Sequence, residues 1–178
     1  MSVGDYFTTI VDTEVTPEEA GSLGQEILRW LVERGIVLAD PNAECVLAGV
    51  GYPPGPNVEE ATEEANALRG LLTCGMELID RREVHWTLSD GFRCRQCQTL
   101  QEDLDETLED WTAGGDGLLR CSACGWTAPI SDWDSGEPPW GFGNLAFKFW
   151  NWSPLRSEFV AEITRRLAHK VVVPYDKL

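Results

Sequence analysis

Two short cysteine pairs constrain the fold of this chain more than any other feature of its sequence. Cys94 and Cys97 form one Cys-x-x-Cys pair, and Cys121 and Cys124 form a second. A Cys-x-x-Cys turn lets two thiolates converge on one ion, and two such turns supply four sulfur ligands in tetrahedral geometry. Gly125 follows the second pair and permits a tight turn of the backbone there. The sequence therefore predicts that the two pairs fold together around one metal ion.

The segments beside the cysteines resemble a known module. Val84–Leu88 is a predicted strand before the first pair, and Gly125–Ala128 follows the second. With the four cysteines and their turns, residues 86–130 resemble a zinc ribbon, which implies structural Zn2+ as the cofactor. Residues 98–120 separate the pairs, a longer spacing than the roughly 15–20 residues of the common signature. We expect the acidic part of this spacer, Gln101–Asp110, to lengthen the tip of a β-ribbon, because loop lengthening costs little entropy.

Three other chemistries use cysteines of this kind. A redox dithiol needs one pair at the start of a helix after a strand, whereas both pairs lie between strand patterns. A catalytic zinc keeps one position open for water, and four cysteine ligands close that position. An iron site takes the same four thiolates, so zinc and iron remain alternatives. The other two cysteines, Cys45 and Cys74, are expected to be small buried side chains.

The remainder of the chain predicts an α+β fold built from two β-α-β units. The predicted elements are a strand at 6–11, a helix from Thr16-Pro17 to Gly35 and a strand at 36–38, then a strand at 145–152, a helix from Ser153-Pro154 and a strand at 171–173. Such units favour a mostly antiparallel sheet with helices on one face, which resembles a ferredoxin-like arrangement. Between the units, 58–72 is a predicted helix with an acidic exposed side. The predicted organisation is therefore one α/β domain in two parts, 1–83 and 131–178, with the ribbon at 84–130 inserted.

Motifs of the common enzyme classes are absent from the sequence. No glycine is followed by lysine, which excludes the P-loop of ATPases and GTPases. The chain has two histidines and neither a Gly-x-Ser-x-Gly nor a His-Glu-x-x-His motif, so the usual hydrolase and metalloprotease residues are missing. Acid–base catalysis by a pair of carboxylates stays open, although no pair is singled out. The sequence favours a protein that is not an enzyme.

The charge of the chain points to the class of partner. It carries 30 acidic against 14 basic residues, a formal net charge of −16. Such a chain attracts basic proteins and repels phosphates and anionic lipid. Arg93, Arg95 and Arg120 beside the cysteines are too few for strong phosphate binding, so we expect no nucleic-acid partner. The sequence has no apolar run of membrane-spanning length and no signal peptide at its beginning, which predicts a cytoplasmic protein without a membrane partner.

Eight tryptophans are the other unusual feature of the composition. Aromatic side chains rimmed by acids are typical of an interface for a basic partner. The candidate partner-binding residues are Trp126, Trp133, Trp140, Phe142, Glu102 and Asp103. The alternative is that these rings pack the small metal module onto the α/β domain.

These observations lead to three hypotheses of function. The first is a non-enzymatic intracellular binding protein that contains zinc and uses an acidic, Trp-rich surface, for example an immunity or inhibitor protein for a basic toxin. The second is a zinc-ribbon adaptor for nucleic acid or transcription machinery, and the third is a carboxylate-dependent enzyme. The run Gly143–Trp152 with the Val-rich strand after it resembles bacterial proteins of unknown activity, and that resemblance implies no activity here.

Overall fold

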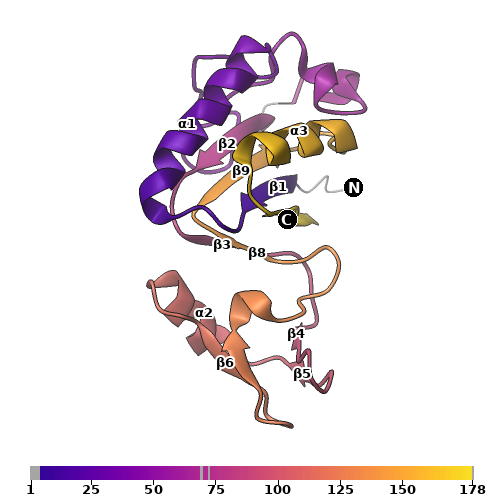
Figure 1. Ribbon diagram of the computed structural model, residues 1–178. Coiled ribbons are helices and arrows are strands. Elements are labelled where there is room, and N and C mark those ends of the chain that lie inside the picture. The colour runs from indigo at the N-terminus through magenta and orange to yellow at the C-terminus, as the bar shows by residue number, and fades with distance from the viewer. Residues whose placement is uncertain (1–4, 69, 72, 178) are drawn as a thin grey trace.

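A computed structural model describes residues 5–68, 70–71 and 73–177, and it shows an α/β body joined to a smaller cysteine module, residues 86–140 (Figure 1). The elements of the body are β1 (Tyr6–Asp12), α1 (Pro17–Glu33), β2 (Gly75–Ile79), β3 (Glu83–His85), β8 (Gly141–Gly143), β9 (Leu145–Trp150), α3 (Ser157–Leu167), β10 (Val171–Val172) and β11 (Tyr175–Lys177). Those of the module are β4 (Phe92–Arg93), β5 (Leu100–Gln101), α2 (Asp105–Thr112), β6 (Leu118–Arg120) and β7 (Thr127–Pro129).

The main sheet of the body has the strand order β10–β1–β9–β2, and β11 also pairs with β1. Every neighbouring pair is antiparallel. The two central strands form the longest ladder, in which Thr9 of β1 lies opposite Lys148 of β9. Helices α1 and α3 lie on one side of this sheet (Figure 1). The predicted class, α+β with a mostly antiparallel sheet, is confirmed.

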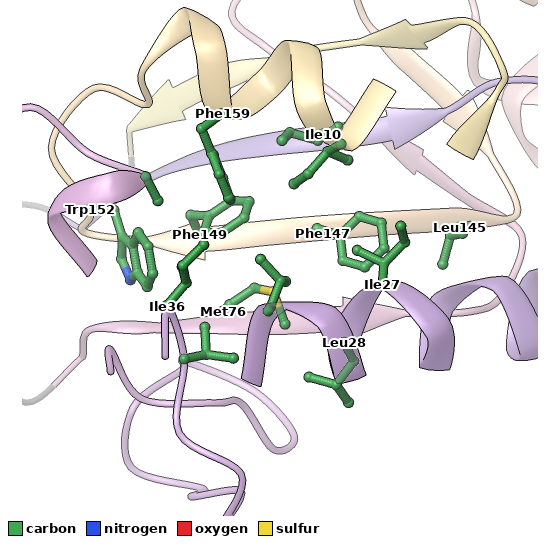
Figure 2. Packing of buried hydrophobic residues seen from close by; sticks show 14 of the residues in the cluster. Ile10, Ile27, Leu28, Ile36, Met76, Leu145, Phe147, Phe149, Trp152 and Phe159 are labelled. Atoms are coloured by element: carbon green, nitrogen blue, oxygen red, sulfur yellow. The ribbon is translucent and has the colours of Figure 1, made fainter. Parts of the chain in front are cut away.

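The main core lies between these helices and the sheet. Phe147 and Phe149 of β9 point toward Ile27 of α1 and Phe159 of α3, and Ile10 of β1 lies beside them (Figure 2). All five side chains are buried, with exposed fractions of 4% or less. The alternation of β9 and the helical spacing of α3 therefore supply one continuous apolar layer, as the sequence pattern predicts.

Two predicted elements are absent, and one begins late. Residues 36–38 form no strand, because their partner segment is rich in prolines that cannot donate to a ladder, and only Val37 bridges Pro54. Within the described residues of 58–72, the predicted helix is replaced by two 3-10 turns, Val58–Glu60 and Ala65–Leu68; positions 69 and 72 of that prediction lie outside the described residues. The helix predicted from Ser153 begins instead at Ser157.

The loss of the helix at 58–72 and the late start of α3 have one cause, which is a pairing between the segments 61–64 and 153–156. The Thr62 hydroxyl donates to the Ser153 carbonyl at 2.7 Å, and the Arg156 amide donates to the Ala61 carbonyl at 2.9 Å. Backbone groups that a local helix would use are thus bonded to residues distant in sequence. Tertiary contacts outweigh local helix propensity at both places.

The two-stranded antiparallel hairpin β3–β8, which carries the cysteine module between its strands, connects the module to the body and packs on the main sheet. Gly141 and Gly143 of β8 face the sheet so closely that a Cβ on Gly141 would lie 2.6 Å from Cγ2 of Val11, and one on Gly143 would overlap the Asp12 carbonyl oxygen. Phe142, between them, points the other way and is buried in the core of the module. Successive side chains of a strand point to opposite faces. The three residues of β8 therefore contact the sheet of the body on one face and the core of the module on the other.

Candidate metal centre

The four predicted ligands come together at the ends of two small hairpins of the cysteine module. Cys94 and Cys97 lie between β4 and β5, and Cys121 and Cys124 lie between β6 and β7. The two turns share the same hydrogen bonds: the Gln98 amide donates to the Cys94 carbonyl at 2.8 Å, and the Gly125 amide donates to the Cys121 carbonyl at 3.0 Å. Both of these donor residues have left-handed backbone, with φ of 63° and 78°. The glycine predicted to permit the second turn therefore does so, and Gln98 adopts the same conformation in the first.

The distances between the sulfur atoms match those around a tetrahedral ion. All four Sγ atoms lie within 4.8 Å of one another. The closest contacts cross between the turns, at 3.5 Å from Cys97 to Cys121 and 3.7 Å from Cys94 to Cys124. Sulfurs about 2.3 Å from a zinc ion are separated by about 3.8 Å in a tetrahedron, whereas a disulfide requires about 2.05 Å. The cluster is in metal-binding geometry, and its donor set fits zinc.

The cluster has a buried side and an exposed side. Cys94 and Cys121 are buried against the module core, whereas Cys97 and Cys124 are exposed. The Gln96 amide points to the Cys94 sulfur at 3.4 Å, the N–H to sulfur contact of a tight metal-binding turn. A hydrogen bond with the Thr99 hydroxyl lowers the pKa of the Cys97 thiol to about 6. A thiolate is thus available near neutral pH before metal arrives, and the thiolate is the form that binds metal.

The aromatic candidates for partner binding lie around this cluster, most of them inside the module. Trp133 and Phe142 are buried, with exposed fractions of 3% and 6%, and Trp126 and Trp140 are partly buried. The Trp126 ring lies tilted by 44° to the Trp133 ring at a centroid distance of 5.0 Å, and Trp140 contacts Phe92 edge-on at 5.2 Å. Rings of this kind form the core that a small metal module otherwise lacks. The packing alternative therefore accounts for Trp133 and Phe142, and these two side chains offer little surface to a partner.

The acidic spacer is an ordered helix, and the predicted β-ribbon tip is wrong. Residues Asp105–Thr112 form α2; Leu104, just before the helix, packs onto the module core together with Leu108 and Trp111. That spacing, i, i+4 and i+7, is a helical signal that the sequence reading missed. Glu102 and Asp103 lie just before this helix and are exposed. The helix turns its apolar side to the metal cluster and its acids to solvent.

Two other residues that hold the module together were not found from the sequence. Buried Gln101 accepts a hydrogen bond from the Ser122 amide at 3.2 Å and so joins the first hairpin to the second turn. Arg82 donates to the carbonyls of Trp111 and Gly115 at 2.5 and 2.9 Å, and its guanidinium lies 4.0 Å from the Trp111 ring centre. A single glutamine or arginine carries no sequence signal for these roles.

The module core also extends past residue 130, where the sequence predicts a domain boundary. Its side chains run from Val84 to Phe142 and include Trp133 and Trp140. The boundaries 1–83, 84–130 and 131–178 remain a prediction. The structure agrees with the expectation for Cys45 and Cys74, which are free, buried and placed in separate apolar clusters.

Within the described part of the chain, none of the helices combines the length and apolarity needed to span a bilayer. Comparison with known proteins finds no matching family model, no matching curated protein and no matching solved structure. The cysteine cluster and its surroundings are therefore the basis for assigning a function.

Proposed function

We propose that this chain is a non-enzymatic binding protein in which a structural zinc ion holds an acidic helix in position for a basic protein partner. The observation that carries the proposal is the charge of residues 98–119. This segment contains seven acidic residues and no lysine or arginine. All seven side chains are exposed, and none lies within 4.0 Å of a basic nitrogen among the described residues.

Uncompensated charge of one sign on a rigid element is what an electrostatically guided interface requires. Asp110 of α2 accepts a hydrogen bond from the Gly117 amide at 2.9 Å, which fixes the end of the helix relative to β6. Arg82 and the apolar side of α2 fix it to the hairpin and the metal cluster. A basic partner would meet acids that are already in place, so little entropy is lost in ordering them.

The metal is structural in this proposal, and the module is a zinc ribbon inserted into a ferredoxin-like domain. Four thiolates close the coordination shell, which supports a structural role. The strand order and the two helices on one face support a split β-α-β arrangement in which the ribbon extends the hairpin between β2 and β9. A metal site of four cysteines requires reduced sulfur, which supports a reducing compartment, the cytoplasm. An immunity or inhibitor protein that neutralises a basic toxin is the form of this function that fits best.

The test compares two triple variants of equal charge change. One is Glu102→Lys, Asp103→Lys and Glu109→Lys beside and on α2, and the other is Glu18→Lys, Glu26→Lys and Glu33→Lys on α1; all six side chains are exposed. The probes are purified basic proteins encoded by neighbouring genes, measured by biolayer interferometry at low and high salt. We expect salt-sensitive binding that the α2 variant loses and the α1 variant keeps. Equal loss in both variants, or binding of duplex DNA in place of the basic proteins, would contradict the proposal.

A further inference from the structure

A cleft of about 530 Å3 lies between the body and the cysteine module. From the body, its lining includes Thr13, Glu14 and Lys170. From the module and its hairpin, the lining includes Arg82, Asp132 and Trp140. A volume of this size at the junction of two structural units is typical of a small-molecule site.

The charges that line the cleft are balanced and unpaired. Glu14 and Asp132 are negative, and Arg82 and Lys170 are positive. None of the four lies within 4.0 Å of an oppositely charged group in the described chain. On a protein of net charge −16, this pocket carries two charged groups of each sign. Each side of the cleft supplies one cation and one anion, so a ligand that bridges the sides meets both.

Hydrogen bonds hold parts of both walls of the cleft in place. Buried Asp12 accepts hydrogen bonds from the Glu14 and Val15 amides, both at 3.0 Å, which fixes the loop after β1. The Glu14 carboxylate accepts a hydrogen bond from the Lys170 amide at 2.7 Å, which joins this loop to the start of β10. On the opposite wall, Arg82 is held by the Trp111 ring and by two carbonyls. Fixed groups lose little entropy when they bind a ligand.

Two residues of the lining also hold buried polar atoms without a partner in the described chain. These atoms are Nε1 of Trp140, a donor, and Oδ1 of Asn144, an acceptor. An unpaired buried polar group costs roughly 1–3 kcal/mol. Both atoms have almost no accessible surface, so they add no contact for a ligand in the cleft as it stands.

We propose that this cleft binds a small zwitterion of the α-amino acid class. Arg82 and Lys170 are the groups for its carboxylate, Asp132 and Glu14 are the groups for its ammonium, and the Trp140 ring is the apolar surface for its side chain. This inference is independent of the basic partner, because the acids of α2 lie outside the cleft lining.

The experiment is calorimetric titration of the full-length, zinc-loaded chain with free L-phenylalanine, L-leucine and L-glutamate. We expect saturable binding of at least one amino acid at one site per chain. N-acetylation removes the cation and amidation removes the carboxylate, so each blocked analogue of that amino acid should bind about tenfold more weakly. Absence of saturable binding of all three up to about 10 mM, or equal binding of the blocked analogues, would overturn the proposal.

Variants at exposed positions locate the site. Lys170→Glu and Asp132→Lys change one charge on each side of the cleft, and both residues are exposed, so neither change disturbs the core. Their matched controls are Lys177→Glu and Glu26→Lys, which are also exposed and lie outside the cleft lining. We expect both cleft variants to weaken binding about tenfold and both controls to retain it. Loss of binding in the controls to the same extent would place the ligand elsewhere and overturn the proposal.

Discussion

The carboxylate of Asp12 lies 2.8 Å from Nδ1 of His169 and links the end of β1 to the turn after α3. Asp12 is completely buried, and its other oxygen accepts two backbone hydrogen bonds. His169 is 30% exposed. The hydrogen bond to Asp12 raises the pKa of His169 above its usual value. When His169 is protonated, its imidazolium balances the charge of the buried Asp12 carboxylate and links the two loops.

This pair predicts a pH dependence of stability. A raised pKa in the folded state means that the stabilisation is fully present below the unfolded pKa of about 6.5 and is lost as pH rises through the folded pKa. We expect the free energy of unfolding of the wild type, minus that of His169→Gln, to decrease between about pH 6 and pH 8. Urea denaturation at each pH measures this difference. A difference that grows with pH would contradict the assignment.

Removal of one metal ligand should empty the whole site. We expect Cys121→Ser to lower the metal content from one zinc per chain to none, because three thiolates and a hydroxyl no longer give the cluster its tetrahedral sulfur shell. Cys45→Ser is the matched control, since Cys45 is free, buried and outside the cluster. Elemental analysis gives the metal content. A melting temperature lower by roughly 10 °C in the first variant would follow if the metal contributes several kcal/mol. Full zinc retention in Cys121→Ser would refute the four-cysteine site.

The close approach of β8 to β1 predicts opposite effects for two glycine substitutions. Gly143→Ala places a Cβ against the Asp12 carbonyl and a Val11 methyl, so we expect destabilisation of about 2–3 kcal/mol. Gly21→Ala, inside α1, has no atom closer than 3.8 Å to the new Cβ, so we expect stabilisation of up to about 1 kcal/mol from helix propensity. Thermal and urea denaturation compare the two. If Gly143→Ala left the free energy of unfolding unchanged, the β3–β8 hairpin would be able to move away from the sheet at little cost.

Arg82 should be needed for the order of α2. We expect Arg82→Gln to cost about 1–2 kcal/mol, because the substitution removes the charged contact with Trp111 and hydrogen bonds to two carbonyls. Hydrogen exchange at the amides of α2 should increase in this variant. Arg81→Gln is the control: Arg81 is exposed and pairs with Glu83 on the surface, a contact of about 0.5 kcal/mol. Faster exchange in both variants alike would show that Arg82 has no special role.

The sequence was most informative where chemistry or local periodicity fixes the result. Two Cys-x-x-Cys pairs allow few arrangements, and the structure brings all four sulfurs together. The strand at β1 and the helix at α1, which ends before Gly35 with its positive φ, follow from local pattern and backbone sterics. The apolar spacing in α3 likewise predicts which side chains are buried.

Contacts distant in sequence account for most of what was missed. The pairing of Thr62 with Ser153 removes one predicted helix and shortens another, and a local reading of either segment has no access to it. The acids of 102–110 favour an exposed β-ribbon tip, whereas the helical spacing of the leucines between them predicts α2. The burial of Trp133 and Phe142 depends on the tertiary core of the module, which the spacing of single aromatic residues does not specify.

The strand order of the main sheet has a consequence for synthesis on the ribosome. β1 is made first, yet both of its neighbours, β9 and the β10–β11 pair, come from the final part of the chain. In the nascent body, the apolar strand β1 therefore stays unpaired until the end of the chain has been synthesised. The core of the cysteine module runs only from Val84 to Phe142, so all of its contacts are available earlier. Metal capture by the module can precede closure of the sheet, and the body is the part of the nascent chain that remains exposed to aggregation longest.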